Sequence, residues 1–169
     1  MAIKCQFVSA LPTGEQYEIS AGNHRAVITE VGATLRSFSI EGRDVVHGFG
    51  VQDKVSGGRG QNLIPWPNRI RDGRYTFDGT TQQLPLTEPA RHNASHGLAR
   101  YVPWVLVDHK ADSVTNRIRI HPQPGWPGTL ESTLTHQLSP DGLTVTVEAT
   151  NAGTGQVFGT KTSAPVLML

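Results

Sequence analysis

Apolar and polar residues alternate along most of this chain in short runs. The runs are separated by 18 glycines and 11 prolines, which are spread evenly along the sequence. Period-two alternation between turn residues is typical of short β-strands. Strands are therefore predicted at Tyr17–Ser20, Ala26–Glu30, Leu35–Ile40, Asp44–Phe49, Trp104–Asp108 and Arg117–His121.

The clearest local pattern surrounds Ser139-Pro140-Asp141-Gly142, where a long alternating run lies on each side of the turn residues. Each run places apolar residues on one face: Leu130, Leu134 and Leu138 before the turn, and Leu143, Val145, Val147 and Ala149 after it. This pattern predicts a β-hairpin with a four-residue loop over Ser139–Gly142.

No stretch of about ten residues or more shows the 3.6-residue spacing of an amphipathic helix. The fold class is therefore predicted to be all-β, and an antiparallel β-sandwich is the simplest way to bury the apolar face of each sheet. A chain of 169 residues is long enough for one domain with its own core. We expect a single domain over residues 1–169.

The chain has almost no net charge, because its 15 Lys and Arg nearly balance its 14 Asp and Glu. We therefore expect no nucleic-acid partner and no membrane partner. Cys5 is the one cysteine, so no intrachain disulfide can form. No run approaches the roughly 18 apolar residues of a membrane span, and no secretory signal is visible. A cytoplasmic location is expected.

Gly57–Gly97 is loop-rich and carries five arginines, of which the four at Arg59, Arg69, Arg71 and Arg74 lie close together and suggest a local site for an anion or a polyol. Asn68 and Arg69 follow Pro65-Trp66-Pro67, so an extended, rigid backbone is expected to present them. An amide and a guanidinium together offer the donors and the acceptor that sugar hydroxyls need. The alternative is a structural ion pair of Arg69 with Glu88 or Asp72.

His96 is the second candidate, because histidine exchanges protons near neutral pH. The following Gly97 would let a ligand approach the backbone closely. His92 and His96 share a face only in a helix, which Pro89 opposes, and no third ligand follows. No metal is expected. The alternative for His96 is a hydrogen-bonded structural histidine.

Other residues carry weaker signals. His136 lies on an apolar hairpin face and is expected in the core or at its rim. Trp66, Trp104 and Trp126 could stack on a sugar, although large aromatic residues are more often core residues. Gly57-Gly58-Arg59-Gly60 resembles a phosphate loop only superficially, because it lacks the lysine and the helix.

Taken together, these motifs resemble the aldose 1-epimerase (galactose mutarotase) family. The resemblance runs from Tyr17 to Phe158 and is carried by Leu63–Gly79 and Gln83–Gly97. It implies a galactose mutarotase-like β-sandwich that interconverts the α and β anomers of aldohexoses such as galactose or glucose. It also implies a monosaccharide substrate and no cofactor.

The resemblance assigns roles to three residues. Asn68 and Arg69 match the family's substrate-binding pair, and His96 matches the catalytic histidine that contacts the ring oxygen. The second histidine has no counterpart after Phe158-Gly159, and the general-base Glu belongs to a second half of the family sequence. The chain is therefore expected to be truncated at its C-terminus, and each absent group is expected to lower activity by roughly 10²–10⁴-fold.

Three alternatives remain open at this point. The chain could be a sugar-binding module without catalysis, or a hexose-6-phosphate epimerase-like protein that uses Arg71 and Arg74. It could also self-associate through an unpaired sheet edge in its last residues, 159–169, because an unpaired strand offers free backbone groups to another chain.

Overall fold

The computed structural model describes residues 10–155, which form antiparallel strands gathered chiefly into two four-stranded sheets. The first sheet has the order β1 (Gln16–Ala21), β2 (His24–Thr29), β3 (Leu35–Ile40) and β4 (Arg43–Asp44). The second has the order β12 (Gly142–Asn151), β11 (Leu130–Ser139), β10 (Ser113–Ile120) and β9 (Val105–His109). The all-β class is confirmed. In this part of the chain no helix is long and apolar enough to cross a membrane.

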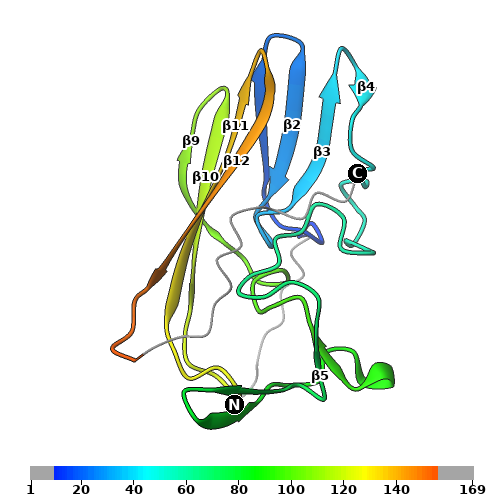
Figure 1. The fold of residues 1–169 in the computed structure, drawn as a ribbon. Coiled ribbons are helices and arrows are strands. Elements are labelled where there is room, and N and C mark those ends of the chain that lie inside the picture. The colour runs from blue at the N-terminus through cyan, green and yellow to red at the C-terminus, as the bar shows by residue number, and fades with distance from the viewer. Residues whose placement is uncertain (1–9, 156–169) are drawn as a thin grey trace, which may run out of the picture.

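The two sheets lie face to face as a sandwich (Figure 1). Residues of the first three strands point inward and pack against Val114 of β10 and Leu138 of β11. In β3 a register shift against β2 places Leu35 and Phe38, three positions apart, on the same side. Their inward set is Ile19, Ala26, Ile28, Leu35 and Phe38. The predicted sandwich is therefore confirmed, and period-two alternation together with the irregularity between β2 and β3 produces its packed face.

The predicted hairpin is present, but its loop is shorter than expected. Ser139 pairs with Gly142, so two residues, Pro140 and Asp141, connect β11 to β12. The Ser139 hydroxyl accepts a hydrogen bond from the Asp141 amide at 3.1 Å, which satisfies the turn locally. The predicted faces are confirmed, because Leu134 pairs with Val147 and Leu138 with Leu143.

The strand predicted over Asp44–Phe49 is wrong beyond its first residue. β4 ends at Asp44, and the chain then bends so that Gly48 packs close to the backbone carbonyl of Arg36. Phe49 is buried, and it reaches the interior from a loop. The other predicted strands lie within β1, β2, β3, β9 and β10 to within two residues at the ends, except that β10 begins earlier, at Ser113.

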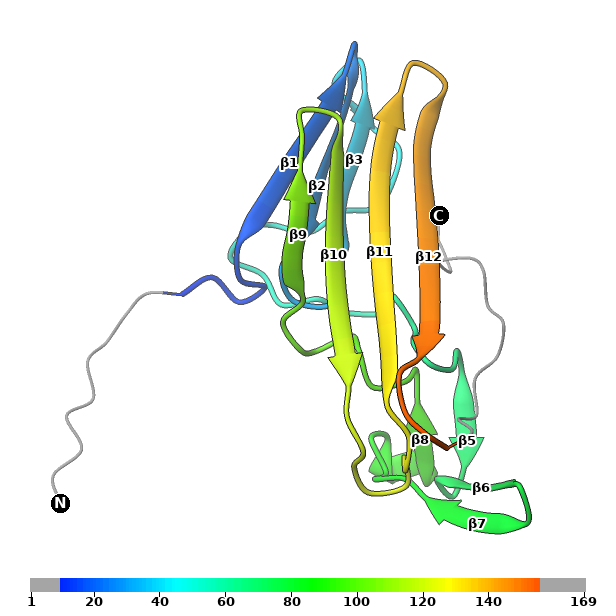
Figure 2. The ribbon, with the colours of Figure 1, turned by 90° about the vertical axis from the view of Figure 1, so that its left-hand side faces the viewer.

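The loop-rich segment predicted over Gly57–Gly97 forms two small antiparallel ribbons. β5 (Arg69–Arg71) pairs with β8 (Asn93–Ser95), and β6 (Arg74–Phe77) pairs with β7 (Thr80–Gln83). A short three-ten turn, η1 (Pro89–Arg91), precedes β8. The second sheet extends past the first, and this segment gathers at its far end (Figure 2).

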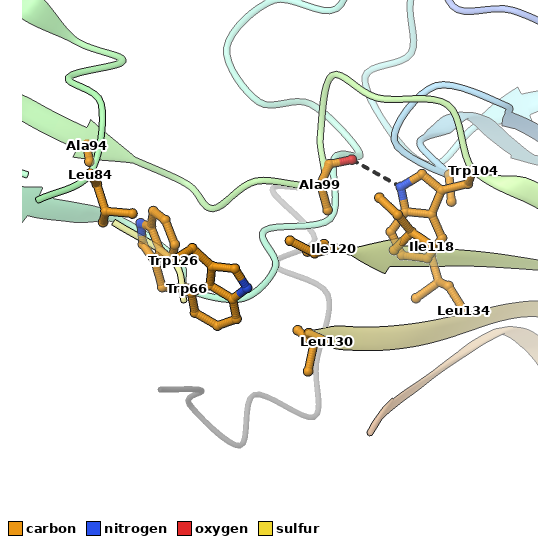
Figure 3. Packing of buried hydrophobic residues seen from close by; sticks show 11 residues of the cluster. Trp66, Leu84, Ala94, Ala99, Trp104, Ile118, Ile120, Trp126, Leu130 and Leu134 are labelled. Carbon is orange, nitrogen blue, oxygen red and sulfur yellow. Dashed lines mark hydrogen bonds between the residues drawn. The ribbon is translucent and has the colours of Figure 1, made fainter. Parts of the chain in front are cut away.

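A second core cluster joins this segment to the second sheet (Figure 3). Trp66, Trp104 and Trp126 are only 4%, 2% and 1% exposed, so they are core residues and offer no open platform for a sugar. Trp104 donates a hydrogen bond from Nε1 to the Ala99 carbonyl at 3.0 Å. The cluster continues onto the sheet through Ile118, Ile120, Leu130 and Leu134.

One edge of the second sheet is apolar. Val105, Leu106 and Val107 of β9 are 63%, 41% and 53% exposed.

The run after Phe158 lies outside the described residues. It includes the predicted unpaired edge at 159–169 and the position of the missing second histidine. Self-association through that run therefore stays a prediction.

Two polar side chains are buried on the inner face of the second sheet. Asn116 and His136 are 0% and 2% exposed, and no residue in 10–155 pairs with the Asn116 amide or with His136 Nδ1. Burial lowers the pKa of His136 to about 4, because the charged ring would lose its hydration. The predicted core position is confirmed, although Nδ1 lacks the partner expected of a satisfied core histidine.

We predict that His136 makes the protein less stable as the pH falls. The unfolded chain binds this proton near the ordinary value of 6.5 and the folded chain only near 4. The free energy of unfolding should therefore drop between these two values, by roughly 3 kcal/mol in total, and then level off. Urea unfolding at pH 7 and pH 4.5 should show a smaller drop in His136→Leu than in the wild type. His121→Gln, at an exposed position, should behave as wild type. Equal drops in the free energy of unfolding for the wild type and both variants would contradict the prediction.

Candidate functional site

The pairing of β5 with β8 brings the three predicted site residues together. Asn68 precedes β5, Arg69 begins it, and His96 directly follows β8. The His96 amide donates to the Asn68 carbonyl at 2.8 Å, and the Asn68 amide donates to Nδ1 of the His96 ring at 3.0 Å. Residues 28 positions apart in sequence are thus adjacent in space.

The contact between Asn68 and His96 is not an ordinary pair of β-ladder residues. Asn68 and His96 both have a left-handed backbone with φ of 61°, and the imidazole nitrogen accepts the hydrogen bond that a backbone carbonyl would otherwise accept. The extended backbone expected for Asn68 is therefore wrong, and only Arg69 lies in the strand. Such conformations cost about 1–3 kcal/mol each and are enriched at functional sites.

The hydrogen bond defines the protonation state of His96. Because Nδ1 accepts the Asn68 amide, the proton of the neutral ring lies on Nε2, which is then a donor. The pKa of His96 is lowered, first by partial burial and then by the charges of Arg100 and Arg69, while Glu88 opposes the shift. At neutral pH His96 is therefore uncharged and offers one N–H from Nε2.

Arg69 forms the ion pair considered as its alternative role, with Glu88 as the partner. Its Nε and Nη2 donate to the two carboxylate oxygens at 2.6 and 3.0 Å, a bidentate geometry that is strong and specific. Nη1 lies 3.4 Å from Asn68 Oδ1. The hydrogen bond from Arg69 lowers the pKa of Glu88 to about 2. The pair holds the guanidinium in place beside His96.

Gly97 has a different role from the one expected. Its φ is 74°, and a Cβ at this position would collide with the carbonyl of Ile64. The next amide, of Leu98, donates to that same carbonyl at 2.7 Å. The close approach that Gly97 permits is therefore made by the protein backbone, which holds the loop containing His96.

A cavity of about 310 Å³ opens at this point and is lined by Arg69, Glu88, His96, Arg100 and Tyr101, among others. This volume is at the lower end of small-molecule sites. Asn68 does not line the cavity; it contacts the lining through Arg69 and His96. The sequence patterns did not identify Arg100 and Tyr101, because nothing in their spacing shows that the chain turns back toward β5.

The arginine cluster of the sequence separates in space. Arg71 and Arg74 are exposed and do not line the cavity, so the phosphosugar alternative based on them loses its support. Arg59 donates to the carbonyls of Ser56 and Gly48 and holds its own loop. Within residues 10–155 there is no group of three His, Cys, Asp or Glu side chains arranged for a metal.

Comparisons of sequence place the chain among known proteins. The sequence profile described as "Aldose 1-epimerase" matches residues 15–160. The uncharacterized protein YihR of Escherichia coli (strain K12) is 34% identical over 143 residues, which are 84% of this chain and 46% of YihR. The chain thus spans about half the length of this relative.

Solved structures show the same fold. A GalM/aldose epimerase homologue from C. elegans superposes with a TM-score of 0.74 at 24% identity, covering 82% of this chain and 46% of that one. A putative aldose 1-epimerase from Escherichia coli K12 gives a TM-score of 0.70 at 22% identity, covering 82% and 47%. At these identities the likeness shows the fold alone.

We predict that the Glu88 carboxyl titrates at a pKa of about 2, so the Arg69–Glu88 pair persists down to strong acid and is lost only as the pH falls through that value. Carboxyl-detected NMR should show the pKa of Glu88 rising toward its ordinary value of 4.5 in Arg69→Gln. Arg91, with Nη1 3.7 Å from the same carboxylate, provides the matched control, and Arg91→Gln should raise the pKa less. An ordinary Glu88 pKa in the unmodified protein would contradict the prediction.

Proposed function

Because the chain belongs to the aldose 1-epimerase family, we propose that its cavity binds an aldose and takes part in interconverting the α and β anomers of an aldohexose such as galactose or glucose. One observation carries the proposal most directly. The hydrogen bond from the Asn68 amide to His96 Nδ1, at 3.0 Å, leaves Nε2–H of a neutral ring beside the Arg69 guanidinium.

Each residue then has a chemical task. Anomer exchange opens the sugar ring, so the anomeric hydroxyl must lose a proton while the ring oxygen gains one. His96, as the proposed catalytic residue, donates a hydrogen bond from Nε2 to the ring oxygen and stabilises the charge that develops there. Arg69 binds hydroxyls of the same sugar and orients it, and Asn68 positions Arg69 and His96 through its hydrogen bonds, while its direct contact with the sugar stays a prediction. The bond between C1 and the ring oxygen breaks and re-forms after rotation about C1–C2, with no change of oxidation state, so the proposal invokes no cofactor.

The carboxylate in the cavity is a poor candidate for the general base. Glu88 has a pKa of about 2, and a group that releases its proton so readily has little tendency to take one from a hydroxyl. Both of its oxygens are also occupied by Arg69. We therefore propose that residues 10–155 supply the sugar-binding side of the reaction and that the base lies elsewhere.

The wider assignments belong to the same proposal. We place the activity in the cytoplasm, on a monosaccharide substrate, without a nucleic-acid or membrane partner, and we treat residues 1–169 as one mutarotase-like domain. The second candidate function is a non-catalytic sugar-binding module. The ion-paired state of Glu88 favours it, because the cavity then holds donors for a sugar and no free base.

We predict that removing the Arg69 guanidinium weakens sugar binding. A hydrogen bond to a charged donor contributes about 1.5–3 kcal/mol, so Arg69→Ala should weaken the affinity for D-galactose by roughly 10- to 100-fold. Calorimetric titration measures this affinity. Arg71→Ala is the matched control, because Arg71 lies on the same strand outside the cavity. Equal losses in both variants would argue against a binding role for Arg69.

We also predict a His96-dependent effect on mutarotation. Polarimetry of freshly dissolved α-D-galactose should show mutarotation that is faster than in buffer alone. The rate should be lower than that of a site with its own base, because the base lies elsewhere. His96→Ala should return the rate to that of the buffer. The His96 ring accepts a proton only below its ordinary pKa, since that pKa is lowered, so the effect should be constant from pH 8 to pH 7. Saturable binding without any acceleration would favour the sugar-binding module.

A further inference from the structure

Arg100 differs from the other charged residues of the cavity, because it has no carboxylate partner. Its Nη2 lies 3.3 Å from the Ser95 hydroxyl and 3.4 Å from the Ser95 carbonyl, and both are uncharged. Its guanidinium carbon lies 4.7 Å above the centre of the Tyr101 ring. No ion pair involving Arg100 occurs among the described residues.

The cavity therefore has an unbalanced positive charge. Arg69 and Glu88 neutralise each other through two short hydrogen bonds, and His96 is neutral at pH 7. Arg91 reaches Glu88 from an exposed position, with 67% of its side chain accessible, and it does not line the cavity. This leaves Arg100, half-buried, as the uncompensated charge. A partly desolvated cation without a counter-ion is unfavourable, and a bound anion relieves that cost.

The position of Arg100 is also determined by its surroundings. Gln61 is 1% exposed, and its Nε2 donates to the Arg100 carbonyl at 3.2 Å, so the backbone is held from the interior. The Tyr101 ring and Ser95 then hold the head of the side chain. A guanidinium restrained in this way loses little conformational entropy on binding and presents its remaining N–H groups in a fixed fork.

We propose that the cavity takes an aldose that carries an anionic substituent, whose charged oxygens Arg100 binds while Arg69 and His96 bind the sugar ring. Neutral aldoses are then weaker ligands of the same site. The sugar part of this inference rests on the proposed function, and the anion part rests on Arg100 alone. Phosphate and carboxylate both present two anionic oxygens that can accept a pair of hydrogen bonds from a guanidinium fork.

Calorimetric titrations with D-glucose, D-glucuronate, D-glucose 6-phosphate and inorganic phosphate test the proposal. We expect at least one anionic sugar to bind tenfold or more tightly than D-glucose. Arg100→Gln should bring the affinities for that anionic sugar and for D-glucose to within about twofold of each other, a difference of roughly 0.4 kcal/mol. Arg117→Gln, at an exposed β10 position, controls for net charge and should keep the preference.

A measurement on the unmodified protein covers the case in which Arg100→Gln does not fold. Raising NaCl from about 0.05 M to about 0.5 M should weaken binding of the anionic sugar and leave D-glucose unaffected, because salt screens the charge. Equal affinities for neutral and anionic sugars would overturn the anion part while the proposed function stands. Binding of inorganic phosphate as tightly as the sugar phosphate would overturn the sugar part, and failure of all four ligands to bind would overturn both.

Discussion

Burial of the inner face of β10 and β11 is the interaction on which the rest of the structure depends. At one end of these strands Val114 and Leu138 pack against the first sheet. At the other end Ile118, Leu130 and Leu134 pack against the loop-rich segment. Removal of apolar surface from water is the dominant favourable term in folding, and here the same two strands provide it for both clusters.

The site depends on the second of these clusters. Trp66, which precedes β5, and Ala94, the central residue of β8, are both buried in it. Once those strands are paired, Asn68 and His96 face each other and the imidazole becomes an acceptor for a backbone amide. The tautomer of the histidine is thus a consequence of core packing one or two residues away, and a catalytic proposal for Nε2 depends on that packing.

The three basic side chains of the cavity occupy different electrostatic states. Arg69 is neutralised by Glu88, His96 is kept uncharged by burial and by its two cationic neighbours, and Arg100 stays charged and unpaired within the described residues. Charge on Arg100 disfavours protonation of His96, and an anion bound at Arg100 would weaken that effect. Ligand charge and histidine protonation are therefore coupled in this site.

Local sequence determined the strands, because alternation with period two is a property of neighbouring residues, and the faces of the β11–β12 hairpin followed from it. The same reasoning missed the end of β4 and the two-residue loop, where close backbone approaches and a serine hydroxyl decide the geometry. The family motifs identified Asn68, Arg69 and His96, whose roles remain predictions. Only the tertiary structure decided that Arg69 pairs with Glu88, that Gly97 admits the Ile64 carbonyl, and that Arg100 enters the cavity unpaired. The first two of these contacts join residues 19 and 33 positions apart in the sequence, and packing of the whole chain brings such residues together.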